Sequence, residues 1–170
     1  MAKRGPRFLW LRWPRATVAS FHDAGDAITI EMMNESWRDV GIEHRRTCRL
    51  TADAVTVLDE LSLAAGSSAR VSVHWLLDGG RDDVVVVASV PVDIEHHRGE
   101  ENVPYGWVAD SYATRRPANS WRFTTHDPST RVRFASGFGT ARSEEYLRSV
   151  LSGGLGTVAE PAGAFSSEAR

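Results

Sequence analysis

Aromatic and arginine residues that lie close together in this sequence are the groups best suited to holding a sugar. Flat aromatic rings stack on pyranose rings, and the arginine guanidinium forms paired hydrogen bonds with a carboxylate. The sequence places such groups in two loops, around positions 37–38 and 105–107. Two polar residues of a nearby predicted strand, His44 and Arg45, are added to them. The candidate ligand-binding residues are therefore Trp37, Arg38, His44, Arg45, Tyr105 and Trp107. The alternative interpretation is that the loop aromatics only pack against their own domain.

The histidines do not predict a metal site. His96 and His97 are adjacent, so on a strand they point to opposite faces and cannot chelate one ion. His44 lies on the more apolar face of its strand, where a hydrogen-bonded structural histidine is the alternative to a ligand contact. Two turns each supply only two ligands, fewer than the four of a closed zinc site: His22-Asp23 and His126-Asp127.

No hydrolase triad is indicated either. The serines that follow the second predicted strand of the central region have no base beside them in the sequence: Ser62, Ser67 and Ser68. We therefore predict no catalytic residue, no metal ligand and no cofactor for the chain by itself.

The elements that must position these residues are short strands. Alternation of polar and apolar residues, or short β-branched runs, between turn-rich segments predicts strands at residues 8–13, 16–21, 27–32, 42–50, 54–58, 70–77, 84–87, 92–96, 120–124 and 130–134. The central stretch 43–80 reads as three strands of an antiparallel meander. The many short strands and frequent turns favour an all-β, antiparallel β-sandwich over residues 1–142.

Three of these strands and one loop carry further expectations. In the strand at 42–50, Glu43, Arg45, Thr47 and Arg49 form a wholly polar face. The strand at 54–58 is predicted to leave the core at Asp59-Glu60, where charge interrupts the apolar run. The unbroken valines at 84–87 are typical of a strand buried on both faces. Residues 98–119 are predicted to form a long ordered loop, because they are rich in turn residues and carry three aromatics.

The C-terminal part changes character. Ser143 as an N-cap, acidic residues in the first turn and apolar residues at helical spacing predict a short helix at 143–151. From Ser152 onward Gly, Ala, Ser and Pro dominate, so residues 152–170 are predicted to form a disordered tail.

Composition narrows the class of partner. The 170 residues can bury one substantial core, and the net charge of −2 argues against binding nucleic acid through general phosphate neutralisation. Only Lys3 among the 20 basic residues is lysine, which reflects either codon composition or recognition of acidic ligands by arginine. The single cysteine, Cys48, excludes an internal disulfide. No export signal and no apolar span of about 20 residues is present, so no membrane partner is predicted.

Several short matches suggest a family. They are Phe8-Leu9-Trp10, the run His44-Arg45-Arg46 followed by residues 55–59, Gly106-Trp107, Ser111-Tyr112 and Pro117. With these matches, residues 6–140 resemble the C-terminal β-sandwich region of heparinase II/III-like polysaccharide lyases. The resemblance implies a β-sandwich fold and an association with β-elimination on acidic polysaccharides.

The resemblance also implies that the catalytic residues and metal ligands of the family are missing from this chain. In that family an N-terminal helical toroid carries the Tyr and one His of proton transfer. Another His and the metal ligands precede the segment that matches Phe8. None of those positions exists here, so we expect the chain to be non-catalytic by itself and expect an acidic polysaccharide and a helical toroid as possible partners. Localisation would be cytoplasmic by default, or periplasmic if the chain belongs to an exported lyase.

Two alternatives remain open at this stage. The chain is a free-standing carbohydrate-binding or interaction module, or it is an inactive truncated gene product. In the second case an unpaired first strand would make it prone to associate through sheet edges. The identity of the polysaccharide, the oligomeric state and whether Met1 is the true start are not fixed by the sequence.

Overall fold

The computed structural model describes residues 3–4, 10–12, 15–78, 84–111 and 114–155. The strands are β1 (Lys3–Arg4), β2 (Trp10–Arg12), β3 (Ala16–Asp23), β4 (Ile28–Asn34), β5 (Ile42–Leu50), β6 (Ala54–Leu63), β7 (Ser72–Leu77), β8 (Val85–Ala88), β9 (Val92–His97), β10 (Trp107–Val108), β11 (Arg116–Pro117), β12 (Asn119–Thr125) and β13 (Arg131–Gly139). The helices are η1 (Arg38–Val40), η2 (Thr140–Arg142) and α1 (Glu144–Gly153). No helix in these ranges is long and apolar enough to cross a bilayer.

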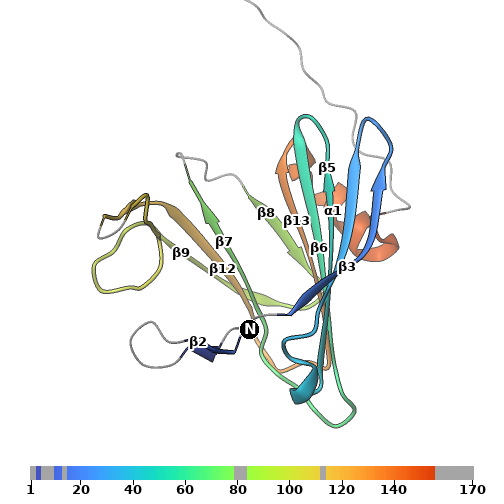
Figure 1. Cartoon of the computed structure of the whole chain (residues 1–170), viewed down its shortest axis with the longest axis horizontal. Coiled ribbons are helices and arrows are strands. Elements are labelled where there is room, and N and C mark those ends of the chain that lie inside the picture. The colour runs from blue at the N-terminus through green and yellow to red at the C-terminus, as the bar shows by residue number, and fades with distance from the viewer. Residues whose placement is uncertain (1–2, 5–9, 13–14, 79–83, 112–113, 156–170) are drawn as a thin grey trace, which may run out of the picture.

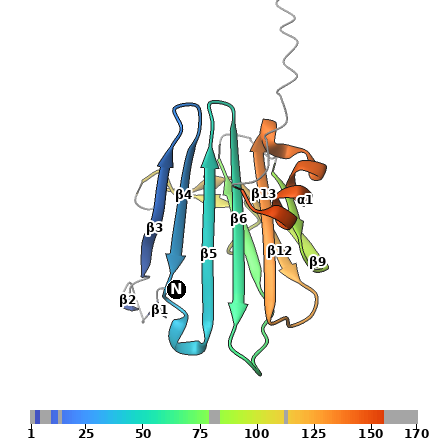
Figure 2. The same cartoon turned by 90° about the vertical axis from the view of Figure 1, so that its right-hand side faces the viewer.

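The main structural element is a six-stranded antiparallel sheet in the order β3-β4-β5-β6-β13-β8 (Figure 2). Its first four strands follow one another in the chain as hairpins. The three-stranded meander predicted for residues 43–80 was wrong for its third strand, because β7 leaves the large sheet and pairs with β12 in a second sheet. Strand β13 then pairs along the whole of β6, from Arg131 opposite Ser62 to Gly139 opposite Ala54. This long-range pairing joins the C-terminal part of the chain to the meander.

A three-stranded sheet in the order β7-β12-β9 faces part of the large sheet, and α1 covers part of the opposite face (Figure 1). Between the sheets, Leu61, Val73, Phe123, Val132 and Phe134 form one buried cluster. Val132 and Phe134 are two residues apart on β13 and therefore share the face of the large sheet that meets the small sheet. The all-β sandwich with a short C-terminal helix predicted from the sequence is confirmed.

Helix α1 forms a second core on the opposite face of the large sheet. Ser143 caps the helix, because its hydroxyl accepts a hydrogen bond from the Tyr146 backbone N–H at 3.3 Å. Leu147 and Val150 are fully buried against the large sheet, in one cluster with Leu58 and Ala135. The helix continues to Gly153, and Leu155 is also buried in this cluster. The disordered tail predicted from Ser152 onward therefore does not begin there, because Ser152 and Gly153 are helical and Leu155 is packed; residues 156–170 lie outside the described part.

Three other expectations need correction or completion. Strand β6 does not leave the core at Asp59-Glu60 but continues to Leu63, and Asp59 is fully buried. The segment 98–119 contains a short ladder in which β10 pairs with β11. Of the strand predicted at 8–13, only Trp10–Arg12 lies among the described residues, where it pairs with β1 as β2.

Asp59 is buried because two basic side chains of β5 satisfy it. Its Oδ1 lies 2.7 Å from His44 Nε2 and accepts a 2.7 Å hydrogen bond from Arg46 Nε, while Oδ2 accepts one from Arg46 Nη2 at 3.0 Å. Trp75 of the small sheet lies over the Arg46 guanidinium, 5.4 Å from ring centroid to Cζ. Burial alone would raise the pKa of Asp59, but the hydrogen bonds from His44 and Arg46 and the Arg46 charge outweigh it and lower the pKa below its ordinary value.

This lowered pKa predicts a specific loss of stability in acid. A carboxyl whose folded pKa is below its unfolded value stabilises the fold above the unfolded pKa, and the contribution is lost as pH falls through the folded pKa. We expect the free energy of unfolding to fall between about pH 5 and pH 2, with a shallower fall in Asp59→Asn. Urea unfolding at a series of pH values measures this. An equal slope in the variant would show that Asp59 is not the group that titrates.

Candidate functional site

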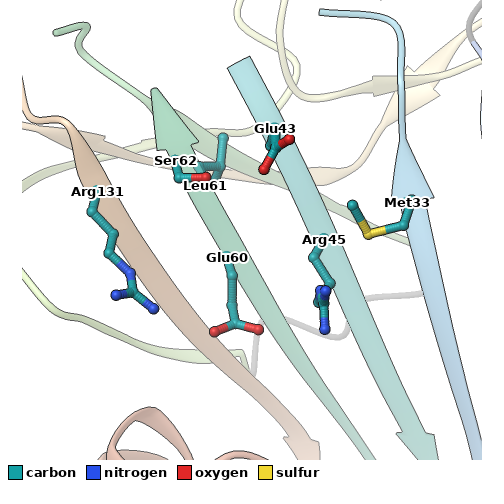
Figure 3. Close-up of a pocket in the computed structure, with 7 residues that line it drawn as sticks. All are labelled: Met33, Glu43, Arg45, Glu60, Leu61, Ser62 and Arg131. Carbon is teal, nitrogen blue, oxygen red and sulfur yellow. The ribbon is translucent and has the colours of Figure 1, made fainter. Parts of the chain in front are cut away.

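A pocket of about 480 Å³ lies on the face of the large sheet that also carries α1 (Figure 3). This volume is within the range of roughly 300–1,000 Å³ seen for ligand sites. The residues that line it come from four neighbouring strands: Met33, Glu43, Arg45, Glu60, Leu61, Ser62 and Arg131. We call this pocket the helix-side groove.

Strand alternation explains why the groove is polar. Arg45 lies opposite Glu60 in the β5–β6 ladder, and Glu60 lies opposite Arg133 in the β6–β13 ladder. Cross-strand partners share a face of the sheet, so these charges form a row across three strands. The wholly polar face predicted for residues 43–49 supplies the β5 part of the groove.

Two charged pairs hold the row in place. Arg45 Nη1 lies 3.1 Å from Glu31 Oε1, and Arg133 Nε lies 3.1 Å from Glu60 Oε1. Arg133 also donates to the backbone carbonyl of Leu151 in α1. The side chains of the row are therefore fixed by neighbouring elements before any ligand arrives, which reduces the ordering cost of binding.

The neighbouring row offers free polar groups. Glu43, Ser62 and Arg131 lie opposite one another on β5, β6 and β13. Within the described part of the chain, neither the Arg131 guanidinium nor the Glu43 carboxylate has a hydrogen-bond or ion-pair partner. Both side chains line the groove, so a ligand with an anionic group and hydroxyl groups finds a free cation and a free acceptor there.

A second pocket of about 200 Å³ extends this region toward η1. It shares Glu43 and Ser62 with the helix-side groove and is also lined by Arg38, Gly41, Leu63 and Ala64. Gly41 ends η1 in the left-handed region at φ 74°, where a Cβ would lie 3.0 Å from the Ala64 Cβ. A glycine is therefore required for the chain to turn from η1 into β5 at this point.

The six residues predicted from the sequence do not form one site. Arg45 lines the helix-side groove and Arg38 lines the adjoining pocket, where it forms a 3.4 Å ion pair with Glu35. His44 lies on the opposite face of β5, bonded to Asp59, and Trp37 lies beside it with ring centroids 5.6 Å apart. These two therefore take part in packing between the sheets.

Tyr105 lies near the small sheet and is held there by that sheet's own side chains. Its hydroxyl accepts a 3.2 Å hydrogen bond from Arg122, and its ring lies near His74 and His97, with centroids 5.5 and 5.9 Å away. The pKa of His74 is lowered by its burial and by the Arg122 charge, which favours the neutral ring.

Trp107 is held within its own loop. The Arg115 guanidinium lies 4.0 Å from its ring centroid, and its Nε1 donates to the Glu100 carbonyl at 3.4 Å. Tyr105 and Trp107 thus both contact side chains or backbone of their own domain, which is what the alternative interpretation of loop aromatics that only pack would require. No described contact joins either ring to the helix-side groove.

The two adjacent histidines point to opposite faces, as predicted. The His96 ring stacks on Trp121 with centroids 4.1 Å apart, whereas His97 Nδ1 lies 3.3 Å from Glu100 on the other face. His126 in the last turn lies 2.9 Å from Asp93. The described residues contain no group of three or more His, Cys, Asp or Glu side chains arranged to hold a metal ion.

Sequence reasoning missed the other polar residues that line the groove: Glu43, Glu60, Ser62 and Arg131. Alternation placed Glu43 on a polar face, and the same rule would have placed Arg131 on the polar face of its own strand. What it could not provide was the β6–β13 register, which brings Arg131 beside Ser62 across a large separation in sequence. Ser62 lines the groove, and no histidine is among the lining residues that the structure describes.

Comparison with known proteins gives a structural likeness. No protein-family model matches the sequence, and no curated protein matches it. Among solved structures, a heparinase III is similar with a TM-score of 0.59 and 14% sequence identity, covering 76% of this chain and 22% of that protein. A heparan sulfate lyase from Pedobacter heparinus is similar with a TM-score of 0.51 and 11% identity, covering 74% of this chain and 22% of that one.

These likenesses confirm the resemblance predicted from the sequence at the level of fold. The described β-sandwich corresponds to part of the fold of heparinase-type lyases. The chain spans about a fifth of the length of these structures, because it covers 22% of each.

Proposed function

We propose that this chain is the β-sandwich module of a heparinase II/III-like polysaccharide lyase system, and that it holds an acidic polysaccharide without cutting it. The observation that carries this proposal is the helix-side groove, with its free Arg131 on a fold similar to that of heparinase-type lyases. The fold supports the proposed class of system, and the groove supports the proposed acidic ligand.

The groove supplies the contacts that an acidic sugar needs. Arg131 forms paired hydrogen bonds with the sugar carboxylate, because its planar guanidinium matches that geometry. Glu43 and Ser62 accept hydrogen bonds from the ring hydroxyls. Met33 supplies apolar surface for the carbon face of the ring. Arg45 and Glu60, already paired with Glu31 and Arg133, set the shape of the groove.

The same groups are poorly suited to β-elimination. That reaction needs a group that neutralises the uronate carboxylate, a base for the adjacent proton and an acid for the leaving oxygen. Arg131 and the free Glu43 carboxylate match the first two groups, but the described side chains that line the groove include no histidine or tyrosine to protonate the leaving oxygen, and Glu60 is paired with Arg133. In our proposal a second body, a helical toroid as the family resemblance implies, supplies these groups.

Arg131→Gln is expected to weaken binding of heparan sulfate oligosaccharides by about ten- to a hundredfold, since a hydrogen bond to a charged group contributes roughly 1.5–3 kcal/mol. Titration calorimetry with the purified chain measures the loss. The matched control is Arg148→Gln, which removes an exposed arginine paired with Glu144 on α1 and should leave binding unchanged. Equal affinity of the wild type and Arg131→Gln would exclude the groove as the binding site.

A free-standing carbohydrate-binding module is the second candidate. The two buried clusters on opposite faces of the large sheet favour it, because they give the described residues cores of their own. This candidate predicts full affinity for the glycan without any partner. The module of a lyase system instead predicts that a toroid protein raises the affinity or restores cleavage. An inactive truncated product predicts neither binding nor an effect of the partner.

A further inference from the structure

Strand β3 is an open edge of the large sheet. Among the described residues it pairs with β4 alone, and every one of its eight residues is exposed. An open edge presents backbone N–H and C=O groups to any strand that can reach them. Proteins usually protect such edges with lysine, proline or a charge in the middle of the strand. Strand β3 contains neither lysine nor proline, and its only acidic residue is Asp23 at the end.

A bulge gives this edge an apolar side. The register of β3 on β4 shifts between Val18 and Ser20, so that Val18 lies opposite Met32 and Phe21 lies opposite Ile30. Met32 and Ile30 are two residues apart and share a face, and so Val18 and Phe21 share it as well. They are 65% and 62% exposed, among the most exposed large apolar side chains of the described part. Ile28 and Leu50, opposite each other on the next two strands, are also exposed on this face.

The charges at the ends of this edge are self-complementary. Arg15 precedes the strand and Asp23 ends it. The Arg15 side chain is exposed and has no ion-pair partner among the described residues, whereas Asp23 Oδ1 accepts a 2.8 Å hydrogen bond from the Gly25 N–H. When two copies pair antiparallel along β3, Arg15 of each copy lies near Asp23 of the other copy, so opposite charges meet at both ends. Parallel pairing would place like charges together.

From these observations we propose that two copies of this chain pair antiparallel along β3 to form a closed dimer. Val18 lies opposite Phe21 of the second copy, and by the twofold symmetry Phe21 lies opposite Val18 of the second copy. The backbone groups of the two edges pair with each other, and the sheet continues across the dimer axis. The exposed apolar strip of β3 is thereby covered by an identical strip.

The alternative head-to-tail arrangement fits less well. The other edge of the large sheet is β8, which has four residues against the eight of β3. Pairing β3 with β8 of another copy would leave half of β3 open and would not bring Arg15 to Asp23. Self-pairing matches the two strands in length and closes the assembly, so it stops at two copies.

Sedimentation velocity of the full chain over a range of concentrations tests the dimer. Val18→Lys places a charge in the middle of the edge and is expected to give a monomer with an unchanged circular dichroism spectrum. The control Val40→Lys changes a similarly exposed valine on η1 and should leave the dimer intact.

A charge swap tests the register. Arg15→Glu and Asp23→Arg are each expected to raise the dimer dissociation constant roughly tenfold, and the double variant to restore it, because only the pairing of opposite charges has been exchanged. Dimerisation of the wild type, its loss in Val18→Lys and the restoration together support the proposal. A wild type that stays monomeric at all concentrations, a dimer insensitive to Val18→Lys, or a swap that fails to restore dimerisation would overturn it.

Discussion

Replacing Asp59 by alanine is expected to lower the free energy of unfolding by about 3–5 kcal/mol. The Asp59 side chain is 1% exposed and bonds both His44 and Arg46. Its removal leaves a largely buried imidazole and a guanidinium held under Trp75 without their acceptor. Breaking one side of a buried charged network costs far more than its net contribution, since the remaining groups stay desolvated. Urea denaturation followed by tryptophan fluorescence measures the change.

The matched control for Asp59 is Asp93→Ala. Asp93 also contacts an arginine and a histidine, Arg70 at 3.2 Å and His126 at 2.9 Å, but its side chain is 54% exposed. Exposed pairs of this kind contribute about 1 kcal/mol or less. A loss of less than about 1 kcal/mol in Asp59→Ala, or similar losses in the two variants, would contradict the role given to the buried network.

Leu147→Ala in α1 is expected to lower the free energy of unfolding by about 2–5 kcal/mol. Leu147 is fully buried between the helix and the large sheet, in one cluster with Leu58, Ala135 and Val150. Truncation removes apolar contacts and leaves a cavity under a helix that the sheet cannot easily close. Thermal and urea unfolding of the purified variant measure the loss.

The control on the same helix is Leu151→Ala, because Leu151 is only partly buried against this cluster. It should lose clearly less than Leu147→Ala. If Leu147→Ala changes stability by no more than the control, α1 would be an appendage and not the second core of the domain.

Local patterns in the sequence predicted most of the fold. Alternation over residues 42–50 gave both the strand and its polar face, and the valine run at 84–87 predicted a strand buried on both faces. In the structure Val86 packs toward the small sheet while Val85 and Val87 pack toward α1. Ser143 predicted the start of the helix correctly. These features depend on neighbours in sequence, which is why they can be read from it.

Features that depend on long-range register could not be predicted. Asp59 looked like the point at which β6 leaves the core, because a carboxylate is costly to bury without partners. Its partners are side chains of β5, and the sequence of β6 alone does not show them. Arg131 joins the groove only through the β6–β13 pairing. The ladder of β10 with β11 has two residues in each strand, too few for any periodic pattern.

The central claim, that the helix-side groove holds an acidic glycan without cutting it, is tested most directly by equilibrium dialysis. The purified chain and its Arg131→Gln variant are dialysed against a heparan sulfate oligosaccharide, and the recovered ligand is weighed by mass spectrometry. We predict that the wild type retains the oligosaccharide, that the variant retains much less, and that the ligand is recovered with unchanged mass. Equal retention by both proteins, or recovery of shorter fragments with an unsaturated uronate end, would contradict the account.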